Sequence, residues 1–97
     1  TVEEIPRTMT SREVAAYFGR SHPHVMRDIR HLDMRFASQD EYASFARKNI
    51  FRSQYLDSRG KAQPLIELTE KAVLLLAAGY NSEKAVALLT KFIVSQL

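Results

Sequence analysis

Residues 10–36, TSREVAAYFGRSHPHVMRDIRHLDMRF, constrain the fold of this chain most, because they carry signals for two successive helices. Thr10 and Glu13 have the spacing of a capping box, in which the two side chains satisfy free amide donors at a helix N-terminus. Gly19 stands where the first helix needs a left-handed residue to end. Ser21 is a good N-cap for a second helix. The pattern predicts a helix of about two turns, a tight turn and a longer helix.

The second predicted helix has two unlike faces. Its apolar side chains recur at helical spacing and are expected to face the core: Val25, Met26, Ile29, Leu32 and Phe36. Its other face carries arginines and histidines, which are suited to phosphates and to base edges. A short helix that braces a longer one with such an outer face is the layout of a helix-turn-helix, whose second helix enters the DNA major groove.

The pattern changes between residues 50 and 69, where two extended runs flank the turn-rich sequence DSRGK. They predict a β-hairpin, and a hairpin after a helix-turn-helix indicates the wing of a winged helix. Arg52, Arg59 and Lys61 can reach a phosphate or a minor groove, although turn tips are also polar simply because they face water. Residues 37–49 predict either a short helix capped by Asp40 or a polar connector.

The two ends of the chain are apolar in different ways. Near the start, Val2 and Ile5 are expected to add a short strand or to pack on the core. Thr69 can cap a helix over residues 70–79 that is apolar on almost every side, so we expect it to be buried all round. A last helix is expected to begin at Asn81 and Ser82. Its apolar stripe is wider than a domain of this size can cover, which predicts a homodimer interface or packing on a downstream segment.

Size and composition indicate one soluble globular domain spanning residues 1–97. The net charge is +3 and the pI near 9.4, with a net +2 in residues 10–36, so DNA affinity should be moderate and strongly salt-dependent. No apolar run is long enough to span a membrane and no secretory signal is visible, so the expected location is the cytoplasm. Because the chain starts at Thr1 rather than at Met, we expect it to be a piece of a longer protein.

The sequence shows no catalytic constellation, and we expect no enzyme activity, no cofactor and no metal. Ser21 and His22 are adjacent but rarely face each other at a helix start, and the three glycines are isolated. His24, Asp28 and His31 have a spacing that could gather metal ligands, but a closed site would need carboxylates from elsewhere. Asp28 is instead expected to orient Arg30 or His24, or to pair with Arg12, because a carboxylate would repel phosphate.

Three motifs stand out along the chain: T-S-R-E from Thr10, H-x-H-V-x-R-D-I from His22 and Y-x-D-x-x-G-K from Tyr55. Together they resemble the Rha family of phage regulatory proteins, over about residues 9–92. The resemblance implies a winged-helix-like DNA-binding domain with a regulatory role in a phage or prophage. It also implies that the functional or motif-defining positions are His22, His24, Arg27 and Asp28.

We therefore predict a mainly α domain with a small β-hairpin: a winged helix-turn-helix with the helix pair at 10–36, the wing at 50–69 and two apolar helices at 70–97. Its predicted partner is duplex DNA, with the second helix in the major groove. The alternative is an antirepressor-type interaction module that binds a repressor through its C-terminal helices. The residues predicted to contact DNA are Arg20, Ser21, His22, His24, Arg27, Arg30, His31, Arg59 and Lys61. Protonation of the histidines should strengthen binding as the pH falls toward about 6.

Overall fold

The computed structural model describes residues 8–37, 40–80 and 82–97, so Val2, Ile5 and Asn81 lie outside the described residues. Within these ranges the order of elements is β1 (Thr8–Thr10), α1 (Ser11–Phe18), α2 (His22–Ala37), α3 (Asp40–Asn49), β2 (Ile50–Leu56), β3 (Ala62–Thr69), α4 (Glu70–Gly79) and α5 (Glu83–Gln96). The fold is therefore mainly helical with a small antiparallel sheet, as predicted. No helix in the described ranges is long and apolar enough to cross a membrane.

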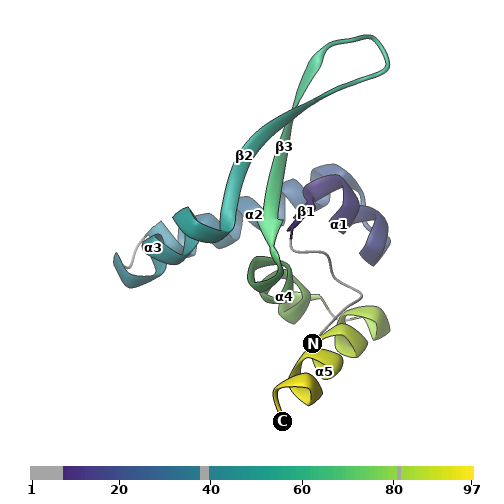
Figure 1. The fold of residues 1–97 in the computed structure, drawn as a ribbon. Coiled ribbons are helices and arrows are strands. Elements are labelled where there is room, and N and C mark those ends of the chain that lie inside the picture. Colours follow the sequence, from purple (N-terminus) through teal and green to yellow (C-terminus); the bar gives the residue numbers. More distant parts are fainter. Residues whose placement is uncertain (1–7, 38–39, 81) are drawn as a thin grey trace.

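The three strands pair in the order β1-β3-β2, so the strand that is last in sequence lies in the middle. Met9 of β1 pairs with Leu68 of β3, and Leu68 pairs on its other side with Ile50 of β2. β1 is only three residues long, so most of the β2–β3 hairpin extends beyond it (Figure 1). The predicted hairpin is confirmed, and β1 adds a third strand to it.

The core lies where α1, α2, α4 and the base of the hairpin meet. Its fully buried side chains include Val14 of α1, Val25 of α2, Leu68 of β3 and Val73 of α4. The predicted apolar stripe of α2 is confirmed at Val25 and Ile29, and its remaining members are partly buried. Residues 40–49 form the helix α3, the first of the two alternatives, and Ala37 is the last residue of α2.

α4 follows directly from β3 and is capped by Thr69, whose hydroxyl accepts a hydrogen bond from the Ala72 amide. The prediction that this helix is buried all round is wrong. Five of its ten residues are buried, but Leu75 is 41% exposed and Ala78 also faces solvent. α4 packs against α5, β3, β1 and α2, and these contacts leave Leu75 and Ala78 uncovered. In Figure 1 α5 lies at the end of the molecule opposite the hairpin.

Candidate nucleic-acid interface

The turn between α1 and α2 is built as the sequence predicts. The Thr10 hydroxyl accepts a hydrogen bond from the Glu13 amide at 3.1 Å, and Glu13 Oε1 accepts one from the Thr10 amide at 2.9 Å, which completes the capping box. α1 ends at Gly19, whose φ of 67° lies in the left-handed region that glycine adopts without a steric cost. Ser21 Oγ then accepts a hydrogen bond from the His24 amide at 3.3 Å at the start of α2. These contacts fix the direction in which α2 leaves α1.

His22 anchors the start of α2 inside the protein. The Ser11 side chain is fully buried, and its Oγ accepts a hydrogen bond from the Ile66 amide of β3 at 3.1 Å. The same Oγ lies 2.8 Å from His22 Nε2. Burial, and then the positive charge of Arg12, lower the pKa of His22. The neutral ring is therefore favoured, and its Nε2 shares a hydrogen bond with the Ser11 hydroxyl.

The same histidine also connects α2 to the hairpin. The edge of the His22 ring faces the Tyr55 ring of β2 at 6.0 Å between centroids, and the Arg12 guanidinium lies 4.1 Å from the centre of that Tyr55 ring. The structure thus gives Arg12 an aromatic partner, rather than the ion pair with Asp28 that was one of the expected alternatives. The Nε2 of His22 contacts Ser11 and its ring contacts Tyr55, so His22 connects α2 with α1 and with the hairpin.

A second polar cluster joins α2 to α4. The Arg20 guanidinium stacks 4.0 Å above the Tyr80 ring, and its NH1 lies 3.3 Å from His24 Nε2. His24 Nε2 also lies 3.5 Å from Asp28 Oδ2, so the expectation that Asp28 orients His24 is confirmed. Arg20 and His24 are both half-buried, so neither projects freely from the outer face of α2.

Tyr80 is the buried centre of this cluster. Burial, and next the negative charge of Asp28, raise the pKa of the Tyr80 hydroxyl to about 12. The hydroxyl and Asp28 Oδ2 are both buried, yet neither makes a hydrogen bond of regular geometry within the described residues. A recess of about 240 Å³ between α2 and α4 is lined in part by these two residues and by His31. The described ranges contain no group of three His, Cys, Asp or Glu residues that could hold a metal ion.

The outer face of α2 is the part that is open to a ligand. Arg27, Arg30 and His31 are exposed there, beside Met34, which is 66% exposed. The side chains of Arg27 and Arg30 make no hydrogen bond or ion pair with another described residue. Their charges are therefore available to an anionic partner without breaking a contact within the described chain.

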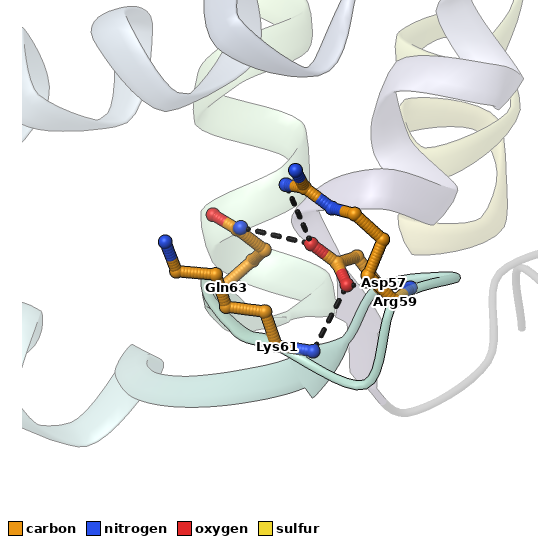
Figure 2. A network of polar contacts seen from close by, with 4 residues as sticks. All are labelled: Asp57, Arg59, Lys61 and Gln63. Carbon is orange, nitrogen blue, oxygen red and sulfur yellow. Dashed lines mark hydrogen bonds and ion pairs between the residues drawn. The ribbon is translucent and has the colours of Figure 1, made fainter.

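The hairpin tip is organised by one carboxylate, which Figure 2 shows with its partners. Asp57 Oδ1 accepts hydrogen bonds from the amides of Arg59 and Lys61, each at 2.9 Å. Asp57 Oδ2 accepts one from Gln63 Nε2 at 3.1 Å and lies 3.4 Å from the Arg59 guanidinium. These contacts, the Lys61 amide first, lower the pKa of Asp57. Gly60 has a φ of 76°, the left-handed conformation that lets the turn close.

The structure therefore divides the predicted contact residues into two sets. The exposed set is Ser21, Arg27, Arg30, His31, Arg59 and Lys61. The half-buried set, held by contacts within the chain, is Arg20, His22 and His24. Sequence reasoning missed the buried role of Ser11, which has no local signature. It also missed the role of Asp57, although an aspartate at the start of a D-S-R-G turn is a recognised turn signal.

Comparisons with known proteins agree with one another in extent. The family model described as phage regulatory protein Rha matches residues 9–95. A protein of Haemophilus influenzae strain Rd, described as "Uncharacterized protein", is 34% identical over 83 residues, which cover 86% of this chain and 46% of that protein. The chain thus spans about half the length of this curated relative. The search of solved structures finds no match.

Proposed function

This chain belongs to the Rha family of phage regulatory proteins, and from that premise we propose that it binds duplex DNA as a winged helix-turn-helix domain. In this proposal α2 lies in the major groove and the β2–β3 hairpin is the wing. The domain serves the regulation of genes in a phage or prophage. A regulatory family, and a chain in which we find no catalytic constellation, both favour a binding function over an enzymatic one.

The observation that carries the proposal is the outer face of α2. Arg27 and Arg30 project from it, exposed and without an ion pair inside the described chain. Arg27 can donate two hydrogen bonds to a guanine edge, and such a contact discriminates between bases by about 1–3 kcal/mol. The opposite face of α2 is held in the core by Val25 and Ile29, so the outer face is the one presented to a partner.

The order of the elements supports the same proposal. A strand precedes α1, a longer helix follows it, and an antiparallel hairpin projects from the same body (Figure 1). His22 packs against Tyr55 and so links the start of α2 to the hairpin. The helix and the hairpin are therefore connected by direct side-chain packing, as a reading helix and a wing that grip one duplex would need to be.

The electrostatics favour moderate affinity. Arg59 shares its charge with Asp57, whereas Lys61 forms no ion pair within the described residues. Binding is expected to strengthen as the pH falls toward about 6, because protonated histidine side chains add positive charge. His22 contributes little to this effect because its lowered pKa keeps it neutral.

A fluorescence-anisotropy titration of the chain with a labelled mixed-sequence duplex tests the proposal. Binding should weaken as salt rises, and Arg27→Ala should weaken it further, because a charge and two donors are lost from the reading face. Lys71→Ala is the matched control, since Lys71 is an exposed cation at the start of α4. Absence of binding at low salt, or equal losses in the two variants, would contradict the proposal.

One observation favours a second function, a protein-interaction module of the antirepressor type. α5 has only two buried residues, while Val86, Ile93 and Val94 are 56%, 58% and 60% exposed. Such an apolar surface suits a protein partner, either a repressor or a second copy of this chain in a homodimer. These three positions are suitable probes, because neighbouring apolar residues of α5 such as Leu89 and Phe92 pack partly against the core.

Sedimentation distinguishes the two partners of α5. If α5 forms a homodimer, wild type should sediment as a dimer at tens of micromolar and Ile93→Glu as a monomer. A strict monomer for wild type would exclude the homodimer. A repressor that binds wild type but not Ile93→Glu would then support the antirepressor function.

A further inference from the structure

A small recess lies between α2 and the hairpin, on the side of α2 away from α4. It has a volume of about 90 Å³. Its lining comes from both elements: Met26, Ile29, Arg30 and Asp33 of α2, Arg52 of β2 and Ile66 of β3. The two isoleucines are buried core residues, so the base of the recess is apolar and rigid, and the arginines are the positively charged groups of its lining.

Strand pairing fixes the place of Arg52. Arg52 is directly opposite Ile66 in the antiparallel pair, so the two side chains leave the same face of the hairpin. Because Ile66 is buried toward α2, Arg52 is held on the α2 side of the hairpin near its base. Arg59, in contrast, lies at the tip of the hairpin and has Asp57 as a partner.

Both arginines at the recess are uncompensated. Arg30 and Arg52 are exposed, and neither forms an ion pair or a side-chain hydrogen bond with another described residue. Asp33 contributes to the lining but pairs with neither guanidinium, so the recess keeps a net positive charge. Two guanidinium groups beside a small recess suit a phosphate, which accepts bidentate hydrogen bonds from arginine.

We propose that this recess holds one backbone phosphate of the bound duplex, contacted jointly by Arg30 from α2 and Arg52 from β2. The inference rests on the proposed DNA-binding function and adds to it a contact that fixes the register of the protein on the duplex. Arg52, rather than Arg59 at the tip, is then the main cationic contact of the hairpin. A phosphate bound at the base of the hairpin also places the duplex against the outer face of α2.

The test is a salt series of anisotropy titrations between about 50 and 200 mM with wild type, Arg30→Gln, Arg52→Gln, the double variant and the control Lys71→Gln. Each phosphate contact contributes about 0.9 to the slope of log K against log salt. When the salt concentration rises fourfold, a variant that lacks one phosphate contact should therefore lose about 3.5-fold less affinity than wild type does. Arg52→Gln and Arg30→Gln should each flatten the slope, and Lys71→Gln should not.

The double variant shows whether one phosphate is shared. If both arginines hold the same group, the loss of affinity in the double variant is smaller than the product of the two single losses. Independent losses that multiply would overturn the joint contact. Unchanged melting temperatures of the exposed-site variants verify that the fold is intact.

The outcomes separate this inference from the function on which it rests. Suppose that wild type binds with a salt-dependent affinity and Arg27→Ala weakens binding, but Arg52→Gln has the same slope of log K against log salt as Lys71→Gln. The phosphate contact at the recess is then overturned, and the DNA-binding function stands. If wild type binds no duplex at low salt, both are overturned.

Discussion

The most informative perturbation of the fold is Ser11→Ala, because one buried hydroxyl joins three elements. Ser11 is the first residue of α1, and its Oγ accepts a hydrogen bond from the Ile66 amide of β3 at 3.1 Å. The same Oγ lies 2.8 Å from His22 Nε2 of α2. Alanine fits the same space but leaves both groups without this partner. The change therefore tests the hydrogen bonds rather than the packing.

The magnitude follows from the burial of the two groups. A buried amide that loses its acceptor costs about 1–3 kcal/mol. His22 is only half-buried and can take up water, so its loss adds up to about 1 kcal/mol. We expect the free energy of unfolding to fall by about 2–3 kcal/mol, and the melting temperature of a domain of this size to fall by about 10–15 °C.

Thermal and urea unfolding followed by circular dichroism measure this loss. Ser58→Ala is the matched control, since Ser58 is an exposed serine in the hairpin turn. A Ser11→Ala protein that melts within about 2 °C of the control, a difference of about 0.5 kcal/mol, would refute the reasoning. It would mean that the Ile66 amide and the His22 ring find other partners at no cost.

Three further predictions concern titration, the hairpin tip and the buried tyrosine. Because the pKa of His22 is lowered in the folded state, the unfolded chain binds a proton at His22 more readily. The free energy of unfolding should therefore decrease as the pH falls through about 6.5. His22→Gln should remove this decrease, measured by urea unfolding at pH 7.5 and 5.5. Asp57→Ala should speed exchange of the Lys61 amide with solvent, measured by NMR, because its acceptor is gone; unchanged exchange would show that Asp57 does not order the tip. Tyr80→Phe should leave the free energy of unfolding unchanged or raise it by up to about 1 kcal/mol, because it removes a buried hydroxyl that has no hydrogen-bond partner of regular geometry. A loss above about 1 kcal/mol in urea unfolding would show that the hydroxyl is hydrogen-bonded.

Local signals in the sequence predicted most of the α1–α2 region and the hairpin. These signals are the capping box of Thr10 and Glu13, the left-handed Gly19 and the DSRG turn. Each involves residues at most four positions apart, so neighbouring residues determine its geometry. A short strand was one expectation for Val2 and Ile5, which lie outside the described residues, but its position at Thr8–Thr10 was not predicted. Three residues carry no usable periodicity, and the pairing partner lies near residue 68.

The candidate interface was predictable only in part, because which side chain faces outward depends on contacts between distant elements. Arg27 and Arg30 lie on the outer face as the helical period indicates. Arg20 and His24 turn toward Tyr80, and that contact depends on where α4 packs, which the local pattern of α2 does not encode. The burial of Ser11 likewise depends on Ile66, 55 positions away.

The central position of β3 has a consequence for how the chain folds during synthesis. β1 pairs with β3, so the sheet cannot close until residues near 68 have left the ribosome. Val14 and Val25 gain their full set of core neighbours only after α4, with Val73 and Leu76, has followed. The α1–α2 region is therefore synthesised before the elements that complete its core, and until α4 has emerged the nascent chain exposes the apolar faces of α1 and α2. A ribosome-bound chain stalled before α4 should accordingly be far more sensitive to protease than one stalled after it has emerged.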